Sequence, residues 1–279
     1  MISRISSRLS SRLHRGNLFA LEAEIVPPYT ESALIYDHMM KDVDYKRWAK
    51  YIIQLMRVAG IDTRRSNLSG KKICELGTGT GNIAFHLSKY GFDVTGIDSS
   101  SQMLDFAAAK SSRQAKQKLN FLRHDMVTYR SRNQFDGIVC VYDSINYISE
   151  NKSLDLFFKN VFLNLKSSGI FIFDASLEPN SMSDPELFVQ SGGTKGIFYR
   201  RESAYDPGTK IHTTRIRVKR DGKVFEEIHK EYVYGLEALR HVARSAGFIE
   251  KYAAGDFTLL EANDKSERVH FILTKQAHD

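Results

Sequence analysis

The chain has 279 residues, a hydrophobic fraction of 42% and a formal net charge of +7. This length fits one sizeable domain, or a domain with a lid. No apolar run approaches the length of a membrane span. The two cysteines provide neither a disulfide framework nor the spacing of a metal site. The sequence therefore predicts a globular protein of a reducing compartment, the cytoplasm, with no membrane span and no bound metal.

The N-terminal segment is strongly basic and is predicted to form an arm over residues 1–28. Before the first acidic residue, Glu22, the chain carries four arginines: Arg4, Arg8, Arg12 and Arg15. Only three of the seven excess positive charges remain for the rest of the chain, which disfavours a nucleic-acid partner. Residues 1–16 fit a basic, partly disordered arm, a surface helix touching anionic lipid or RNA, or a targeting segment that would place the protein in the mitochondrial matrix.

Residues 29–60 contain the next predicted elements. The run Tyr36-Asp37-His38-Met39-Met40 leads into Asp42-Val43-Asp44-Tyr45. An amphipathic helix is then predicted up to Gly60. Its apolar stripe consists of Trp48, Ile52, Leu55 and Met56. Trp48 is expected to pack this helix on a sheet edge, whereas Tyr36 fits either packing or contact with a ligand.

The most informative stretch, residues 73–98, reads ICELGTGTGNIAFHLSKYGFDVTGID. It predicts a strand, a glycine-rich turn, a helix and a second strand ending in Asp98. Gly77, Gly79 and Gly81 permit a sharp turn and close approach of a ligand, and the helix start offers free N–H groups. A carboxylate at the end of the second strand accepts ribose hydroxyls in dinucleotide folds. The unit is therefore predicted to bind the adenosine part of a cofactor, although G-x-G-x-G differs from the nicotinamide fingerprint.

The following elements alternate between helix and strand. A helix capped by serine is predicted over residues 99–118, with Met103 facing inward. The further predicted elements are a strand at 119–122 followed by His124-Asp125-Met126, a strand at 135–141 with Tyr142-Asp143-Ser144 at its tip, a helix at 153–165, and a turn and strand within 165–174.

The pattern changes after the fifth strand. Residues 177–193 are polar and predicted to be a loop. Three alternating stretches, 197–205, 210–220 and 224–234, are separated by turn signals and predict a three-stranded antiparallel insert over residues 196–234. A helix at 236–246 and strands at 248–253 and 268–274 follow. The expected division is an arm (1–28), a cap and cofactor-binding core (29–195), the insert (196–234) and a C-terminal completion of the core (235–279).

Several of these motifs resemble one family. E-L-G-T-G-T-G-N with V-T-G-I-D-S-S is similar to the first motif and acidic loop of class I S-adenosylmethionine-dependent methyltransferases, and later motifs follow in the family's order over residues 70–175. The pattern Y-D-x-x-M-x-D-V-x-Y-x-x-W resembles the cap of a bacterial subgroup acting on small molecules. The resemblance implies an α/β fold: a Rossmann-like seven-stranded sheet with its last strand antiparallel, helices on both faces, and the antiparallel insert as a substrate lid.

The resemblance also implies roles for individual residues. Gly77, Gly79 and Gly81, with Thr78 in the turn, would cradle the methionine and ribose, and Glu75 would orient the turn and the amino group. Asp98, with Ser99 beside it, would bind the ribose hydroxyls. Met103, Asp125 and Met126 would contact the adenine, and Tyr142 would border the sulfonium. The candidates for catalysis or orientation are Tyr36, Tyr142, Asp143 and His229, with His212 as a further histidine of the insert.

The resulting hypothesis is methyl transfer from S-adenosylmethionine to a small-molecule acceptor by a monomer or homodimer. Three alternatives remain open. The first is an RNA or protein methyltransferase that uses the basic arm as a tether. The second is a non-catalytic cofactor-binding partner protein. The third, a nicotinamide-dependent oxidoreductase, is disfavoured by the glycine spacing.

Overall fold

The computed structural model describes residue 19 and residues 21–64, 68–112, 118–132, 134–149, 151–182 and 188–275. The expectations for residues 1–16 fall outside these ranges. No helix within the described ranges is long and apolar enough to cross a membrane.

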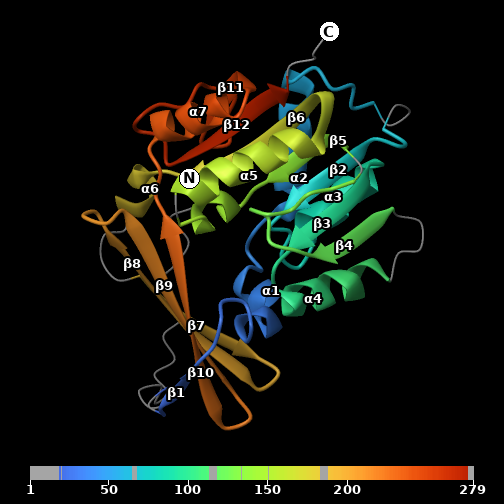
Figure 1. Ribbon diagram of the computed structural model, residues 1–279. Helices are drawn as coiled ribbons and strands as arrows, with labels where there is room; N and C mark the ends of the chain where they lie inside the picture. Colours follow the sequence, from blue (N-terminus) through green and yellow to red (C-terminus); the bar gives the residue numbers. More distant parts are fainter. Residues whose placement is uncertain are drawn as a thin grey trace.

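The core is a seven-stranded sheet with the order β11-β12-β6-β5-β2-β3-β4. Its strands are β2 (Lys72–Leu76), β3 (Asp93–Asp98), β4 (Leu119–Arg123), β5 (Phe135–Cys140), β6 (Leu165–Ser176), β11 (Phe248–Gly255) and β12 (Arg268–Lys275). The strands from β2 to β6 pair in parallel, whereas β12 runs antiparallel to both β6 and β11. This arrangement confirms the predicted Rossmann-like sheet with an antiparallel last strand (Figure 1).

Helices cover both faces of this sheet because each helix has one apolar side. On one face α2 (Tyr45–Val58) and α3 (Asn82–Tyr90) bury side chains such as Ile52 and Leu87. On the other face α5 (Asn151–Asn164) and α7 (Leu236–Ser245) bury Phe157 and Leu239. Helix α4 (Ser101–Ser111) lies beside β4. Trp48 is buried in the first of these layers, which confirms its predicted packing role.

A second sheet of five strands has the order β1-β10-β9-β8-β7 and projects from the core (Figure 1). Its strands are β1 (Ala23–Ile25), β7 (Phe188–Thr194), β8 (Ile197–Asp206), β9 (Ile211–Arg220) and β10 (Lys223–Tyr232). The three predicted strands are β8, β9 and β10. In the turn between β9 and β10 both Asp221 and Gly222 have positive φ, as a two-residue hairpin turn requires.

The second sheet is larger than the sequence predicted. Residues 177–193 were expected to form a loop, but they contain α6 (Glu178–Met182) and most of β7. The side chains of β7 do not alternate in polarity, and Gly192 and Gly193 disfavour a strand. The strand forms because a two-residue turn at Lys195 and Gly196 folds it antiparallel onto β8. The short strand β1, from the expected arm, pairs in parallel with β10.

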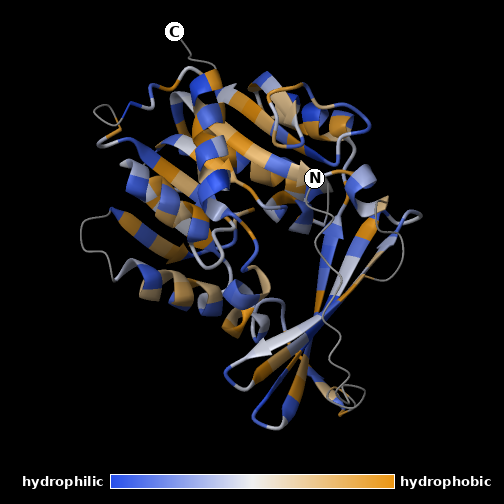
Figure 2. Cartoon of the chain, turned by 180° about the vertical axis from the view of Figure 1, so that it is seen from behind, coloured by the Kyte–Doolittle hydropathy of each residue, from blue (hydrophilic) through white to orange (hydrophobic). Residues whose placement is uncertain are grey.

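Two short helices, η1 (Ser32–Leu34) and α1 (Tyr36–Met39), connect the second sheet to the core. Ile35 and Met39 pack against Tyr199, Ile216 and Val218 of the second sheet. Figure 2 shows the polar and apolar residues alternating along the strands of this sheet. The side of this sheet that carries Tyr199, Ile216 and Val218 is called the inner face. The segment that contains η1 and α1 and packs on this face is called the cap.

Candidate active site

The glycine-rich loop between β2 and α3 contains three glycines with positive φ, and they have different functions. A Cβ on Gly77 would lie 2.5 Å from Ser144 Oγ, and one on Gly81 would lie 2.7 Å from Phe121 Cζ. Both glycines therefore allow other parts of the protein to approach. A Cβ on Gly79 would meet none of the described residues within 4 Å. Only Gly79 thus has the open side that the sequence led us to expect at all three positions.

Glu75 fixes the shape of this loop from within the core. Its Oε2 accepts hydrogen bonds from Thr78 Oγ1 at 2.5 Å and from the Ala84 backbone N–H at 2.9 Å. The carboxyl group is buried, and this burial raises its pKa to about 8 although both hydrogen bonds act to lower it. Glu75 thereby joins the turn to the first turn of α3, as expected for a residue that orients the turn.

Asp98 connects the end of β3 to the glycine-rich loop. Its Oδ2 accepts a hydrogen bond from Gly79 N–H at 2.8 Å, and its Oδ1 accepts one from Ser100 N–H at 2.9 Å. Burial raises the pKa of Asp98 against these hydrogen bonds and a third from Ser99. A carboxylate offers about four acceptor sites. With three of these sites in use, Asp98 can accept a hydrogen bond from one ribose hydroxyl without giving up its contacts to the loop.

The predicted adenine-contacting residues lie around the same edge of the sheet. Met103 is buried in α4, and its N–H donates to Ser100 Oγ, which caps this helix. Asp125 is exposed directly after β4 and accepts a hydrogen bond from Val127 N–H at 2.7 Å. Met126 packs against the core with its sulfur near Gly77. The parallel strands bring these residues together because their carboxyl ends share one edge.

The tip of β5 is held in an unusual backbone conformation. Tyr142 and Asp143 both have positive φ, at 64° and 61°, which is costly for residues with side chains. The Tyr142 ring packs against Tyr45 and Trp48 with centroids 6.1 Å and 5.2 Å apart, and burial raises the pKa of its phenol. This tip lies beside the glycine-rich loop because Ser144 approaches Gly77.

The Asp143 carboxylate is paired with Arg268 of β12. Arg268 Nη1 lies 2.5 Å from Oδ1 and Nη2 lies 2.9 Å from Oδ2. Arg268 also pairs with Asp174, which is fully buried in β6 and accepts a hydrogen bond from Asp143 N–H. Because Arg268 binds both oxygens of Asp143, the arrangement favours a role in fixing the β5 tip over a role as a proton acceptor.

The cap is attached to the glycine-rich loop through Asp37, directly after Tyr36. Asp37 Oδ1 accepts hydrogen bonds from Thr80 Oγ1 at 2.7 Å and Asn82 Nδ2 at 3.2 Å, and Oδ2 lies 2.7 Å from Lys110 Nζ. Tyr36 is partly buried in α1, and its ring meets that of Tyr29 edge-on at 6.0 Å.

His229 belongs to a chain of hydrogen bonds that crosses from the second sheet to the cap and the core. Its Nε2 lies 3.0 Å from Glu227 Oε2, and its Nδ1 lies 3.1 Å from the Tyr147 hydroxyl. The Tyr147 hydroxyl in turn lies 2.6 Å from that of Tyr29. His229 and Glu227 are both buried. By contrast, His212 is partly buried and lies 3.4 Å from Ser181 Oγ, outside this chain.

Glu227 also anchors the cap. It accepts hydrogen bonds from the backbone N–H groups of Tyr29, Glu31 and Ser32 and from the Ser32 hydroxyl. Burial acts to raise the pKa of Glu227. The hydrogen bonds from His229, Ser32 and Glu31 together outweigh burial, so the pKa is lowered. Sequence reasoning missed Tyr29, Tyr147 and Glu227 because they are ordinary residues of three distant segments.

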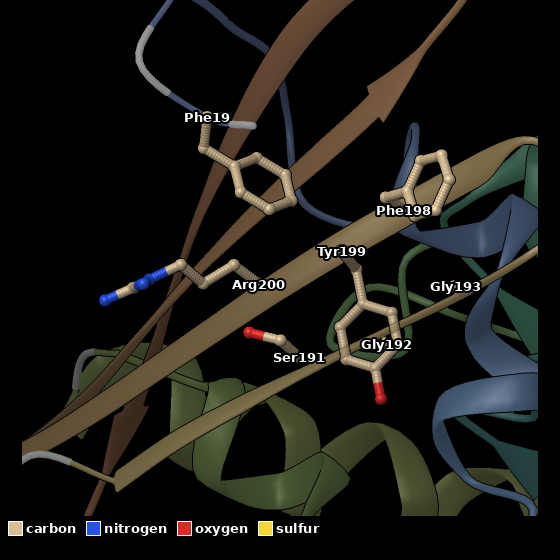
Figure 3. A pocket seen from close by; sticks show the side chains of 7 residues that line it. All are labelled: Phe19, Ser191, Gly192, Gly193, Phe198, Tyr199 and Arg200. Carbon is tan, nitrogen blue, oxygen red and sulfur yellow. The ribbon is translucent and has the colours of Figure 1, made fainter. Parts of the chain in front are cut away.

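A pocket of about 230 Å³ lies elsewhere on the second sheet (Figure 3). It is lined by Phe19, Ser191, Gly192, Gly193, Phe198, Tyr199 and Arg200. Residues of β7 and β8 and the ring of Phe19 border it, and it contains none of the predicted site residues. The candidate active site is therefore placed at the carboxyl edge of the core sheet, where the predicted residues gather, and not at this pocket.

The fold and the site define a class I S-adenosylmethionine-dependent methyltransferase. Residues 73–169 match the family model of a methyltransferase domain. The chain is 30% identical over 249 residues to "Putative methyltransferase YqeM" of Bacillus subtilis (strain 168), covering 87% of this chain and 95% of that protein. The chain therefore belongs to this methyltransferase family, and it is an enzyme that uses S-adenosylmethionine.

Solved structures agree with this assignment. An S-adenosylmethionine-dependent methyltransferase from Clostridium acetobutylicum is 26% identical with a TM-score of 0.73, covering 89% of this chain and 99% of that one. The sugar N-methyltransferase KedS8 from Streptoalloteichus has a TM-score of 0.69 at 16% identity, covering 98% of this chain and 99% of that one. The second likeness supports the fold alone.

Proposed function

We propose that the protein methylates a small molecule that binds between the glycine-rich loop and the inner face of the second sheet. The observation that carries this proposal is the hydrogen-bonded chain Glu227–His229–Tyr147–Tyr29, which ends next to the cofactor edge. Tyr29 reaches that edge because its carbonyl accepts a hydrogen bond from Ser100 Oγ at 3.0 Å, and Ser100 also binds Asp98. KedS8, whose fold this chain shares, is a sugar N-methyltransferase, so this fold can accommodate a small-molecule acceptor.

The residues at the carboxyl edge fit S-adenosylmethionine. Gly79 leaves open space, and Asp98 has free acceptor capacity for a ribose. In the proposed assignment Glu75, Gly77, Thr78 and Gly81 shape the loop. Ser99 lies beside the ribose, while Met103, Asp125 and Met126 border the adenine. Tyr142 and Tyr36 lie toward the methionine end. The cofactor supplies an electrophilic methyl group, so the protein contributes mainly by orienting the acceptor, which can lower a barrier by about 7–11 kcal/mol.

The hydrogen-bonded chain provides a route for the acceptor's proton. The arrangement assigns the Nε2 hydrogen of His229 to Glu227, which leaves Nδ1 to accept from Tyr147. As the acceptor's proton moves to the Tyr29 oxygen, the Tyr29 proton moves to Tyr147 and the Tyr147 proton moves to His229. The imidazolium formed then lies beside the charged Glu227. Burial raises the pKa of the Tyr29 phenol, so Tyr29 passes a proton on and does not remain ionised.

Transfer of a labelled methyl group from S-adenosylmethionine in a cell extract tests the acceptor class. We expect the label in the small-molecule fraction after protein and RNA have been separated. Label that appears only in RNA or protein would contradict the proposal. As a site test, Asp98→Ala should weaken binding of S-adenosylhomocysteine by about 1–3 kcal/mol, the scale of lost hydrogen bonds to a charged group. An unchanged affinity measured by calorimetry would show that Asp98 does not bind the ribose.

The proton route is tested with Tyr147→Phe and His229→Gln. We expect the transfer rate to fall about 10²–10⁴-fold, the usual contribution of a positioned acid or base, while the affinity for S-adenosylhomocysteine stays unchanged. Tyr205→Phe is the matched control, because this phenol of β8 donates to Glu178 and lies outside the route. A full transfer rate in His229→Gln would mean that His229 serves only to anchor the cap.

A further inference from the structure

Arg201 is a cation of the inner face that the proposed function does not use. Strand register places its side chain on the same face of the sheet as that of Ser203. The buried Ser203 hydroxyl lies 2.8 Å from Thr214 Oγ1 on this inner face. Tyr199, two residues earlier, also faces inward and packs against the cap. Arg201 is only partly exposed, and its Nε is buried.

This guanidinium has no ionic partner in the part of the chain that the structure describes. No carboxylate there lies within 4.0 Å of it, and the buried Nε has no hydrogen-bond acceptor. Among the described residues its guanidinium lies over the Phe188 ring, whose centroid is 5.9 Å away. A single exposed cation–π contact is worth only about 0.5–1 kcal/mol, which does not offset the burial of a charged donor. A neighbouring arginine behaves differently: Arg200 faces outward and pairs with Glu202 at 2.6 Å.

The charge of Arg201 reaches groups on different walls of the site. It lowers the pKa of Tyr29 in the cap and of Tyr142 at the β5 tip, although burial raises both overall. It also acts on His212 and Glu231 of the second sheet. Arg201 therefore lies within electrostatic range of the acceptor's surroundings and of the proton route.

Register also sets the distance between Arg201 and that route. Arg201 lies opposite Ile216, whereas His229 lies opposite Thr214. The two positions are thus two residues apart along the strand direction, which is roughly 7 Å, and two strands apart across the sheet, which is roughly 10 Å. A molecule of sugar or amino-acid size can span this separation.

We propose, on the basis of the small-molecule function above, that Arg201 binds an anionic group of the methyl acceptor, a carboxylate or a phosphate. A guanidinium matches the planar, bidentate geometry of both groups. The anion supplies the acceptor atoms that the buried Nε lacks, and it sets the orientation of the acceptor so that its nucleophilic atom points toward Tyr29 and the cofactor edge.

The first experiment titrates the full chain, saturated with S-adenosylhomocysteine, with inorganic phosphate and with acetate. We expect Arg201→Met to weaken anion binding at least tenfold and Arg200→Met to leave it unchanged. Affinity for S-adenosylhomocysteine should be the same in both variants and in the natural chain. Equal anion binding in all three proteins, or none in the natural chain, would overturn the proposal even though the cofactor binds.

Two acidic residues outside the described ranges, Asp184 and Glu186, precede β7. The variant Asp184→Asn/Glu186→Gln serves as a second control. We expect its phosphate and acetate affinities to equal those of the natural chain. An increase of tenfold or more would identify these carboxylates as the partner of Arg201 and would overturn the proposal.

The second experiment identifies the source of the anion. Labelled products from the extract are separated on an anion exchanger above pH 10, where amines are neutral. Retention of the label supports the proposal. Loss of retention after phosphatase treatment indicates a phosphate, whereas unchanged retention indicates a carboxylate. A labelled small molecule that is not retained would refute the role of Arg201 while leaving the proposed function intact, and absence of any labelled small molecule would refute the proposed function itself.

Discussion

The contacts that build the cofactor edge of the core sheet join residues close together in the sequence, whereas those that build the inner face of the second sheet join residues far apart in the sequence. At the cofactor edge, Glu75 binds residues three and nine positions away, and Asp98 binds Gly79 at a separation of 19. At the inner face, Glu227 binds Tyr29 across 198 positions, and Tyr147 meets His229 across 82. The glycine-rich loop with Glu75 and Asp98 can form within one strand-turn-helix-strand unit, whereas the inner face exists only when the whole chain has folded.

The largest effect is expected where a long-range contact carries buried charge. Arg268→Met should lower the free energy of unfolding by about 3–5 kcal/mol, because Asp174 would remain buried without its partner. Chemical denaturation measures this loss. In Arg268→Met/Asp174→Asn the uncompensated charge is gone, so part of the stability should return. A double variant as unstable as the single one would show that Arg268 acts through packing and not through charge.

The next largest loss of stability is expected from substitutions of Gly79 and Gly81 in the glycine-rich loop. Gly81→Ala combines a left-handed φ, costing about 1–2 kcal/mol, with overpacking against Phe121, costing about 1–3 kcal/mol. Gly79→Ala has only the first cost because its Cβ would meet open space.

We therefore expect Gly81→Ala to lose more stability than Gly79→Ala in thermal unfolding. The order should reverse for binding of S-adenosylhomocysteine among the folded molecules, where Gly79→Ala should weaken the affinity more. If Gly79→Ala bound as tightly as the natural chain, the cofactor would not approach this open side.

A pH dependence is expected from the buried carboxyl group of the loop. Burial raises the pKa of Glu75 from 4.5 to about 8. Between these values the folded chain retains a proton that the unfolded chain has released, so stability falls as the pH rises. The slope is at most about 1.4 kcal/mol per pH unit. Glu75→Gln should reduce the change in unfolding free energy between pH 6 and pH 7, whereas Glu267→Gln, an exposed control, should not. Equal slopes in all three proteins would mean that Glu75 is ionised in the folded chain.

The difference in range explains what the sequence could predict. The seven-stranded sheet with its antiparallel last strand was predictable from the family resemblance, and the glycine-rich turn and Asp98 were predictable because this motif contains its own partners. His229 was identified only as a histidine in a strand, since Tyr147 and Tyr29 are not marked by any local pattern. Similarly, β7 was missed because its pairing with β8 depends on the turn at Lys195 and Gly196 and not on its own side chains.

The smallest effect is expected where the cap meets the cofactor edge, and it tests whether the two regions are coupled. Lys110 of α4 pairs with Asp37 at 2.7 Å, but both side chains are partly exposed, so Lys110→Met should change stability by less than about 1 kcal/mol. Its effect should appear instead in kinetics. Loss of this contact loosens the cap over the loop, so S-adenosylhomocysteine should dissociate faster, as measured by stopped flow. Lys118→Met removes a more exposed pair, with Asp93 at 3.3 Å, and should leave the dissociation rate unchanged. Equal rates in the two variants would indicate that the cap moves independently of the Asp37 contact, and that the cofactor edge retains its ligand without help from the cap.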